Sequence, residues 1–425
     1  MDYLAFPPAR SVEGTIRVPA SKSATNRALI LAGLSESEVE VIGPLESADT
    51  RSLVRCLEAM GVSIRQTPEG LAVRGPLTGR GDELVVLDAG DSGTAARFLA
   101  AVAAATPGRF LLTGSPRLRQ RPIEELVTAL VSAGAGISFT DAEGFLPLAI
   151  EGGRLRSGLV DVDASRSSQF VSALLLAGVA VEGGLEVRPK GPIASAPYVR
   201  TTLETLSAFG HRVTPGPVLR SARGALNISR YTPSGDYSSG LALLAAAGAA
   251  GGTVMVQGLA WPSHDADAQA LPALETLGLQ LRRASGGILA SSGAGTRAGA
   301  DIVATDFPDA VPVLAVLAAF GDGESRFRGI GHLRYKESDR IAALAELLTL
   351  AGAEAEAEAD ALVVRGPVRP AAIGAVRLPT FDDHRIAMAA AILSLKVRGL
   401  LIENPGCVAK SYPAFFRDLE SLVKR

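Results

Sequence analysis

An internal repeat of about 70 residues is the feature that most limits how this chain can fold. Six times, a cluster of polar or charged residues leads directly into a helix-like run of small apolar residues. The clusters are marked by Ser23, Ser92, Ser168, Ser238, Asp309 and Asp383, which are 69, 76, 70, 71 and 74 residues apart. Because the pattern returns at a nearly fixed period, we expect six copies of one structural unit.

A second signal with the same period indicates what each unit contains. Five amphipathic helix-like segments end in a glycine and pass into a strand-like segment; the glycines are Gly61, Gly134, Gly210, Gly278 and Gly352. Glycine after the last apolar residue is what a left-handed helix cap requires. Alternating segments that stop at Gly-Pro, such as GLAVRGP and ALVVRGP, indicate strands. Each unit is predicted to be β-α-β-α-β-β, with one helix almost wholly apolar and one amphipathic.

The length of 425 residues exceeds one ordinary core, so six units indicate two domains of three. Hydrophobic residues make up 47% and charged residues 20%, a globular composition that excludes disorder. Apolar stretches are broken before they reach bilayer length, so we expect no membrane span. The start MDYLAFPPAR does not have the pattern of a signal peptide. Cys56 and Cys407 form no disulfide framework, and we expect a cytoplasmic protein.

The charge balance argues against a nucleic-acid partner. Lysine and arginine number 42 against 44 acidic residues, a net charge of −2, so no global field attracts polyanions. The four histidines lack metal-ligand spacing, and no complete P-loop or dinucleotide fingerprint is present, so neither a metal nor a cofactor is expected. The acidic alternation at 352–360 is interpreted as an exposed strand face rather than a recognition tract. A basic site must therefore be a local concentration of cations.

The first cluster, PASKSATNR, places Lys22 and Arg27 at a helix start that Ser21 or Ser23 can cap. Free backbone N–H groups and the positive helix end beside two cations suit a phosphate or carboxylate. A capped surface helix with solvated Lys and Arg is the alternative interpretation. Only the pattern as a whole separates the two.

The second cluster, DAGDSGTAARF, puts Gly90 and Gly93 around a strand-to-helix turn, where glycine permits close approach of an anion to the main chain. Downstream, SPRLRQRPI carries Arg117, Arg119 and Arg121, and Pro122 favours an extended or turn conformation at Arg121. These arginines belong either to a binding loop or to a solvated one.

The third cluster, DASRSSQF, offers hydroxyl and amide groups that orient a polyhydroxylated ligand without adding charge. Serine is also an ordinary helix cap, so this cluster has two interpretations. Ser195 and Tyr198, in the proline-containing loop ASAPYVR, share that ambiguity.

The carboxyl-terminal half is richer in ionisable residues. ATDFPDAVPV places Asp306 and Asp309 at a helix start. In RYKESDR, Lys336 and Arg340 would share a face of a helix, and Glu337 would pair with Arg340, although a salt-bridged surface turn gives the same pattern. FDDHRIAM joins ionisable groups to an apolar helix that should be buried on most sides. Lys410, in CVAKSYPAFF, carries little weight alone.

Taken together, these cations indicate one anion site. They lie at the starts of repeats or in adjoining loops of a chain with no net positive charge: Lys22, Arg27, Arg121, Lys336, Arg340, Arg385 and Lys410. If the repeats within each half converge, the cations meet at one cleft and imply substrates with several negative charges. Acidic residues among them would be available for proton transfer.

With these motifs assembled, the chain closely resembles the 5-enolpyruvylshikimate-3-phosphate synthase family. The match covers the whole length, and the motifs fall in order: PASKSATNR, GDSGTAAR, RQRPI, SRSSQF, DFPDA, RYKESDR, DDHRIAM and AKSYP. The resemblance implies an α/β (α+β) fold, the inside-out α/β barrel of enolpyruvyl transferases. It implies a first domain of residues 1–20 with 237–425 and a second domain of residues 21–236. Crossovers are expected near Glu13–Ser21 and Tyr231–Asp236.

The resemblance also implies the reaction and its residues. Shikimate 3-phosphate and phosphoenolpyruvate would give the enolpyruvyl ether and phosphate through a tetrahedral intermediate. The implied shikimate 3-phosphate ligands are Lys22, Ser23, Arg27, Ser167, Ser168, Gln169, Ser195, Tyr198, Asp309 and Lys336. The implied phosphoenolpyruvate ligands are Lys22, Gly93, Arg121, Gln169, Arg340, Arg385 and Lys410. Asp309 would be the base for the 5-hydroxyl and Glu337 the acid for the methylene carbon, with Lys22 as a further catalytic residue. A monomer is expected.

Three positions depart from the commonest family pattern. Asp91 stands where asparagine is usual, His332 where asparagine or glutamate is frequent, and Tyr335 where valine is usual. The rival assignment is the sister family that transfers enolpyruvyl to UDP-N-acetylglucosamine. That family typically has Lys-Asn in place of Lys22-Ser23 and a cysteine in the loop that here reads GSPRLRQRP. A protein that binds anionic metabolites without reacting them is the third possibility.

Overall fold

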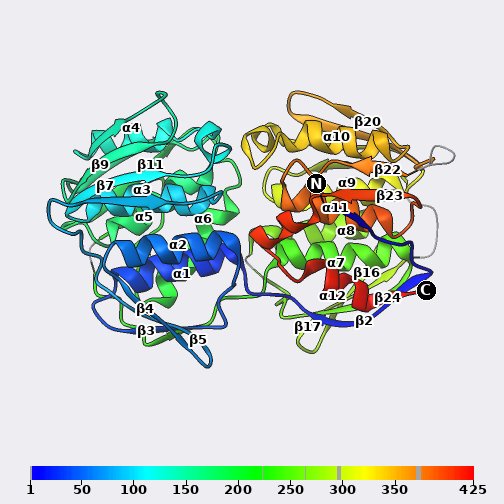
Figure 1. The fold of residues 1–425 in the computed structure, drawn as a ribbon, viewed down its shortest axis with the longest axis horizontal. Helices are drawn as coiled ribbons and strands as arrows, with labels where there is room; N and C mark the ends of the chain where they lie inside the picture. Colours follow the sequence, from blue (N-terminus) through cyan, green and yellow to red (C-terminus); the bar gives the residue numbers. More distant parts are fainter. Residues whose placement is uncertain (1, 223, 264, 294–297, 370–374) are drawn as a thin grey trace. The chain divides into compact units, whose positions relative to one another are not determined.

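The computed structural model describes residues 2–222, 224–263, 265–293, 298–369 and 375–425. It divides into two compact units (Figure 1). The continuous unit is Ala20–Ser234, and the discontinuous unit joins the residues up to Pro19 to Gly235–Arg425. Within the discontinuous unit, the Asp236 N–H donates to the Pro19 carbonyl, at 2.9 Å.

The continuous unit contains three four-stranded sheets with one strand order. Their orders are β14-β3-β5-β4, β6-β7-β9-β8 and β10-β11-β13-β12, and in each the first pair is parallel and the others antiparallel. The strands are β3 (Val39–Ile42), β4 (Ser63–Thr67), β5 (Gly70–Arg74), β6 (Leu84–Asp88), β7 (Gly108–Thr113), β8 (Gly136–Phe139), β9 (Leu148–Gly152), β10 (Gly158–Asp163), β11 (Leu185–Lys190), β12 (Val213–Thr214), β13 (Leu219–Ser221) and β14 (Arg230–Tyr231). The helices are α1 (Lys22–Leu34), α2 (Ala48–Ala59), α3 (Gly93–Ala105), α4 (Glu124–Ser132), α5 (Ser168–Gly178) and α6 (Pro197–Ala208).

The discontinuous unit repeats this plan with sheets β16-β17-β15-β2-β24, β18-β19-β21-β20 and β1-β23-β22. The strands are β1 (Tyr3–Ala5), β2 (Ser11–Arg17), β15 (Gly252–Gln257), β16 (Leu279–Ala284), β17 (Gly287–Ser292), β18 (Asp301–Val303), β19 (Gly323–Arg328), β20 (Glu354–Ala357), β21 (Ala361–Gly366), β22 (Val376–Leu378), β23 (Leu400–Glu403) and β24 (Val423–Lys424). The helices are α7 (Tyr237–Ala250), α8 (Leu271–Thr276), α9 (Val311–Ala319), α10 (Arg340–Leu350), α11 (His384–Ser394) and α12 (Phe415–Leu422). Short 3₁₀ helices cover Leu118–Gln120, Ala266–Ala270, Pro308–Ala310, Gly331–Tyr335 and Pro405–Lys410.

Strand exchange explains why one unit is discontinuous. The amino-terminal strand β2 pairs in parallel with β15 and so opens the fourth repeat, whereas β14 pairs in parallel with β3 and opens the first. The sixth repeat departs from the expected β-α-β-α-β-β unit. Its sheet takes β1 as an antiparallel partner of β23, and β24 pairs with β2 of the fourth repeat instead. The alternation of the two helix types and the mixed sheets confirm the predicted α/β fold class.

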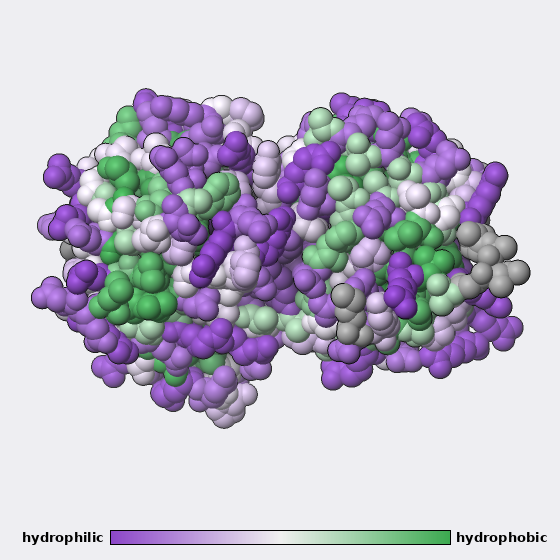
Figure 2. Space-filling view, turned by 45° about the horizontal axis from the view of Figure 1, so that its top comes forward, coloured by the Kyte–Doolittle hydropathy of each residue, from purple (hydrophilic) through white to green (hydrophobic). Residues whose placement is uncertain are grey.

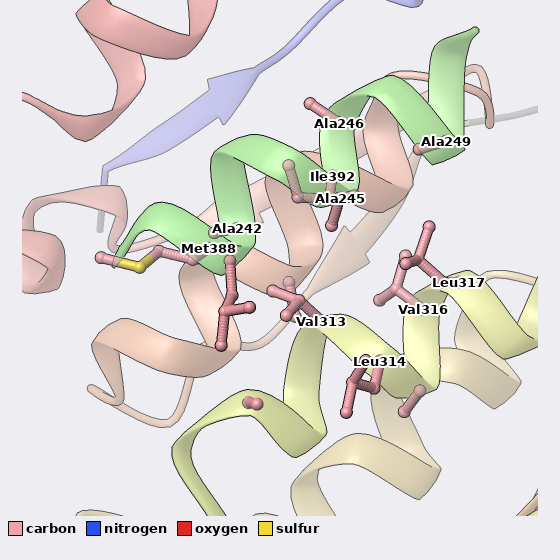
Figure 3. Packing of buried hydrophobic residues seen from close by; sticks show 14 of the residues in the cluster. Ala242, Ala245, Ala246, Ala249, Val313, Leu314, Val316, Leu317, Met388 and Ile392 are labelled. Atoms are coloured by element: carbon pink, nitrogen blue, oxygen red, sulfur yellow. The ribbon is translucent and has the colours of Figure 1, made fainter. Parts of the chain in front are cut away.

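One helix of each pair is buried on nearly all sides, as predicted. In the discontinuous unit, Ala242, Ala245 and Ala246 of α7 pack beside α9 and α11, which contribute larger side chains (Figure 3). A Cβ on Gly248 of α7 would lie 2.9 Å from Leu317 of α9 and 2.6 Å from Leu279. Small residues therefore allow these helices to approach closely, and the polar residues at their starts are held by a rigid core.

The second helices end as the sequence predicted. All five glycines have positive φ, between +82° and +96°, and follow α2, α4, α6, α8 and α10: Gly61, Gly134, Gly210, Gly278 and Gly352. Glu354–Ala357 is strand β20, and its mostly exposed side chains confirm the interpretation of the acidic alternation. In the view of Figure 2, hydrophilic residues predominate on each unit, with smaller apolar patches between them. Over the described ranges, no helix combines the length and apolarity needed to span a bilayer.

Candidate active site

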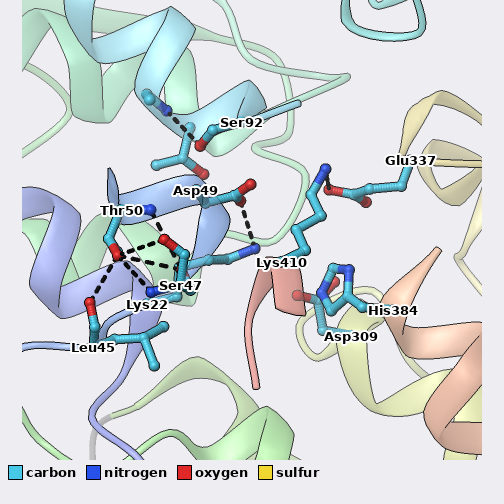
Figure 4. A network of polar contacts seen from close by, with 12 residues as sticks. Lys22, Leu45, Ser47, Asp49, Thr50, Ser92, Asp309, Glu337, His384 and Lys410 are labelled. Atoms are coloured by element: carbon cyan, nitrogen blue, oxygen red, sulfur yellow. Dashed lines mark hydrogen bonds and ion pairs between the residues drawn. The ribbon is translucent and has the colours of Figure 1, made fainter. Parts of the chain in front are cut away.

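The start of α1 is held by a cap and carries a buried ion pair. Ser21 accepts a hydrogen bond from the Ala24 N–H, so Ser21 rather than Ser23 is the cap. The Lys22 ammonium lies 3.0 Å from Asp49 Oδ2, and the two side chains are 14% and 4% exposed. Asp49 is fixed in the first turn of α2 by the reciprocal hydrogen bonds of Ser47 and Thr50 (Figure 4). The predicted site residue Lys22 thus has an acidic partner that the sequence analysis missed.

Arg27 is 1% exposed and joins three helices. Its Nε donates to Thr202 Oγ1 at 2.7 Å, and its two Nη groups donate to the carbonyl oxygens of Ser23 and Tyr198. Its guanidinium also lies over the Phe98 ring, 5.2 Å from the centroid. Its Nη2 also donates to Ser172 Oγ of α5, at 3.5 Å. In this structure Arg27 thus holds α1, α5 and α6 together, a packing role that the sequence analysis did not foresee.

Glycine at position 93 gives room for the Arg121 guanidinium. A Cβ on Gly93 would lie 2.7 Å from Arg121 Cζ, closer than real Cβ contacts. Arg121 is extended, at φ −93° and ψ 129°, as the following proline predicted, and it is buried whereas Arg117 and Arg119 are exposed. Of the three arginines, only Arg121 therefore turns inward.

The departure at Asp91 acts on the same loop. Its carboxylate accepts a hydrogen bond from the Ser115 hydroxyl, and that hydroxyl accepts from the Leu118 N–H at 3.1 Å. Asp91 thus stabilises the turn that precedes Arg121.

The start of α5 supplies neutral polar groups. Ser167 caps the helix by accepting from the Gln169 N–H. The Ser168 N–H donates to Ala194 O, next to Ser195, which has a positive φ of 56° and whose carbonyl accepts from Tyr198 N. The Gln169 amide donates to Thr94 Oγ1 at the start of α3, at 3.0 Å. The third cluster therefore contacts its neighbouring loop through Ser168 and the start of α3 through Gln169.

In the discontinuous unit, the backbone of RYKESDR differs from the helical interpretation. A 3₁₀ turn ends at Tyr335, and α10 begins only at Arg340, with Asp339 as its cap accepting from Ala342 N. Lys336 and Glu337 therefore do not lie on a helix face. The cap was legible in the sequence as an aspartate before an apolar run, but the spacing of Lys336 and Arg340 favoured the wrong interpretation.

Arg340 is the centre of a buried cluster. It is 1% exposed, and three carboxylates accept its hydrogen bonds: Asp309 Oδ1 at 2.7 Å, Glu337 Oε2 at 2.8 Å and Asp383 Oδ2 at 2.8 Å. Burial disfavours its charged form, but Asp383 and then Glu337 outweigh burial and raise the pKa of Arg340 well above its usual value. The guanidinium stays charged and holds both predicted catalytic carboxylates.

Further cations surround those two carboxylates. Lys336 Nζ and Arg385 Nη2 lie 3.9 Å and 3.8 Å from Asp309. Lys410 Nζ lies 3.7 Å from Glu337 (Figure 4). Burial of Asp309 would raise its pKa, but Arg340, Lys336 and Arg385 hold that pKa well below its usual range. The six predicted residues of this unit, Asp309, Lys336, Glu337, Arg340, Arg385 and Lys410, are thus brought together.

Three titratable residues of this cluster were not among the predicted site residues. Asp383 is fully buried and accepts from Arg340, Ser338 and the Arg385 N–H. Asp267 accepts from the Ser238 hydroxyl, and burial followed by the nearby Asp309 raises its pKa to about 7. Burial followed by Lys336 lowers the pKa of His332 to about 4, so this departure adds a neutral ring near the cluster. Tyr335 is 45% exposed.

Comparison with solved structures defines the class of fold. The chain is similar to an EPSP synthase from Acinetobacter baumannii, with a TM-score of 0.78, 26% identity and coverage of 99% of this chain and 98% of that one. It also resembles the enolpyruvyl transferase NikO from Streptomyces tendae, with a TM-score of 0.78, 18% identity and coverage of 98% and 96%. The fold is that of the enolpyruvyl transferases.

Sequence comparison is more specific. The family model of EPSP synthase (3-phosphoshikimate 1-carboxyvinyltransferase) matches residues 7–419. A 3-phosphoshikimate 1-carboxyvinyltransferase from Syntrophobacter fumaroxidans is 38% identical over 423 residues, covering 98% of each chain. One from Methanosphaerula palustris is 38% identical over 421 residues, covering 96% of each. The chain belongs to the EPSP synthase family.

Proposed function

We propose that this protein transfers the enolpyruvyl group of phosphoenolpyruvate to the 5-hydroxyl of shikimate 3-phosphate and releases phosphate, in aromatic amino-acid biosynthesis. Family membership supports the reaction. The observation that carries it in the structure is the Arg340 cluster, where one buried guanidinium holds two carboxylates among further cations. Such a cluster binds an anionic substrate and keeps two proton-transfer groups beside it.

The proposed ligands are divided between the two units. The continuous unit supplies most shikimate 3-phosphate ligands: Lys22, Ser23, Arg27, Ser167, Ser168, Gln169, Ser195 and Tyr198. It also contributes Gly93 and Arg121 to phosphoenolpyruvate. The discontinuous unit supplies the acid and base with Lys336, Arg340, Arg385 and Lys410. For Arg27 we propose that it acts mainly by holding Ser23 and Tyr198 in place, since its N–H groups donate to their carbonyl oxygens.

The chemistry runs in two steps. Asp309 takes the proton of the 5-hydroxyl while the hydroxyl oxygen bonds to C2 of phosphoenolpyruvate, and Glu337, in its protonated form, delivers a proton to C3. The tetrahedral intermediate then loses phosphate from C2 and returns a proton from C3 to Glu337, which restores the double bond in the product. The leaving phosphate takes the proton held by Asp309. Most of the rate enhancement comes from holding two mutually repelling anions in reacting geometry.

Electrostatics couple substrate binding to the base. The cations that hold the pKa of Asp309 low also make it a weak base. A phosphoenolpyruvate anion bound by Arg340 and Arg385 neutralises part of that positive charge. The pKa of Asp309 therefore rises toward its ordinary range when substrate is present, and its proton affinity increases as the hydroxyl arrives.

The cysteines do not suit the UDP-N-acetylglucosamine reaction. The loop around Arg117–Arg121 has no cysteine. Cys56 and Cys407 lie elsewhere, and burial raises the pKa of each thiol to about 12, so neither is a thiolate at neutral pH. This favours shikimate 3-phosphate as the acceptor.

The test is phosphate release from phosphoenolpyruvate with shikimate 3-phosphate, with UDP-N-acetylglucosamine as the control acceptor. We expect release with the first acceptor only. Release with the second alone, or binding of both ligands without release, would overturn the proposal. We also propose a cytoplasmic location and a monomeric state. Sedimentation of the purified chain near 43.7 kDa would support the monomer, and sedimentation as a dimer would refute it.

A further inference from the structure

We infer that Arg97 is a positioning residue, which orients the Gln169 amide and anchors the segment that carries Arg121. The inference rests on the proposed function, because Gln169 and Arg121 are proposed ligands of phosphoenolpyruvate. Arg97 lies on α3, one turn after Gly93, and is 5% exposed. Its guanidinium contacts Gln169 and the carbonyl that follows Arg121, so it is next to two proposed ligands.

The contacts of Arg97 reach two different elements. Its Nη1 donates to Gln169 Oε1 at 2.6 Å, and its Nη2 donates to the Pro122 carbonyl at 3.1 Å. The face of its guanidinium lies over Phe170, 5.4 Å from the ring centroid. The Phe170 ring thus holds the planar guanidinium of Arg97, which donates to two acceptors on separate segments.

The contact with Gln169 determines which end of the amide a ligand meets. A guanidinium only donates hydrogen bonds, so the amide oxygen must face Arg97. The amide nitrogen then donates to Thr94 Oγ1 at 3.0 Å, which leaves its second N–H for a ligand oxygen. A flipped amide would instead present its oxygen to an anion and repel it. Arg97 therefore makes Gln169 a donor toward the substrate.

The contact with Pro122 acts on Arg121. Pro122 follows Arg121 directly, so fixing its carbonyl fixes the backbone from which the Arg121 side chain departs. Arg97, Arg121 and Gly93 line one small hollow of about 10 Å³, which leaves space for no more than one water molecule. The two arginines and Gly93 thus lie around the same small space.

The kinetic test compares Arg97→Met, Arg97→Lys, Gln169→Met and the double variant Arg97→Met/Gln169→Met. Loss of a charge-assisted hydrogen bond predicts that Arg97→Met lowers kcat/KM for phosphoenolpyruvate roughly 10- to 100-fold. Lysine cannot serve both diverging acceptors, so Arg97→Lys should fall in between. Gln169→Met should cost much less in the Arg97→Met background than alone, because the amide is no longer oriented there. Equal costs in both backgrounds would overturn the inference.

A second readout does not depend on turnover. The chain has six glutamines, so selective ¹⁵N labelling gives few side-chain amide signals, and loss of one in Gln169→Met assigns Gln169. We expect this signal to shift and its protons to exchange faster in Arg97→Met, or in Arg97→Lys if the first variant does not fold. The exposed Arg109→Met is the matched control. An unchanged Gln169 signal refutes the role of Arg97, whereas an inactive wild type with the expected signals refutes the proposed function alone.

Discussion

Asp383→Asn is the substitution that most directly probes the Arg340 cluster. Both oxygens of Asp383 are used: Oδ2 accepts from Arg340 Nε and Ser338 Oγ, and Oδ1 accepts from Arg385 N and Arg340 Nη2. Asparagine keeps the shape but replaces one oxygen by an NH₂ group. Whichever way the amide is turned, its NH₂ faces an Arg340 donor.

The magnitude follows from burial. Arg340 and Asp383 are 1% and 0% exposed, so water cannot take over the lost contacts. Breaking a buried ion pair by removing one partner typically costs about 3–5 kcal/mol. Glu337 and Asp309 remain as acceptors and compensate part of the charge, so we expect the lower part of that range, about 3 kcal/mol.

The assay uses the single tryptophan. Trp261 packs against the core of the discontinuous unit, so its fluorescence in urea reports that unit. Asp301→Asn is the matched control, because it breaks an exposed ion pair. The side chains of Asp301 and its partner Arg328 are 58% and 52% exposed. The control should lose at most about 1 kcal/mol. If Asp383→Asn is no more destabilised than Asp301→Asn, the cluster does not stabilise the unit as argued.

The remaining predictions concern the site and its titration. Gly93→Ala should displace Arg121 and raise KM for phosphoenolpyruvate while shikimate 3-phosphate binding measured by calorimetry changes little; an unchanged KM would contradict the contact. Asp309→Ala and Glu337→Gln should still bind both substrates but lose on the order of 10²–10⁴ in kcat, and near-normal turnover in either would refute its role. Since the folded pKa of Asp267 is raised to about 7 from 3.8, its contribution should lower stability progressively as pH rises from about 4 to about 7. Asp267→Asn should therefore gain stability relative to wild type between pH 5 and pH 8 in the Trp261 assay, and a constant difference would disprove the shift.

Local signals in the sequence were sufficient for the helix framework. Ser92, Ser167 and Asp383 are caps because each stands before an apolar run with a side chain that accepts a backbone N–H. The glycine after each amphipathic helix has a positive φ, as a left-handed helix cap requires. Such a cap depends only on neighbouring residues, so the sequence could predict it. The sixth repeat was beyond such reasoning, since the partners of β1 and β24 lie far away in the chain.

The partners of the site residues were not predictable in the same way. Asp49 is 27 residues from Lys22, Gln169 is 72 from Arg97, and Asp383 is 43 from Arg340. Each pair depends on the convergence of helix starts from different repeats, which no local pattern encodes. The motifs correctly predicted that the cations of the discontinuous unit lie close together. Which residues contact substrate stays a prediction.

The acidic partners also bear on how a chain with a net charge of −2 keeps its cationic residues buried. Lys22 pairs with Asp49, and Arg340 pairs with Asp309 and Glu337, so these carboxylates offset part of the cost of burying the cations. A substrate anion must compete with these carboxylates for the same donors. We propose that its binding loosens Asp309 and Glu337, the two residues proposed to transfer protons, from Arg340. Under the proposed function, the carboxylates that stabilise the buried Arg340 are the groups that substrate binding makes reactive.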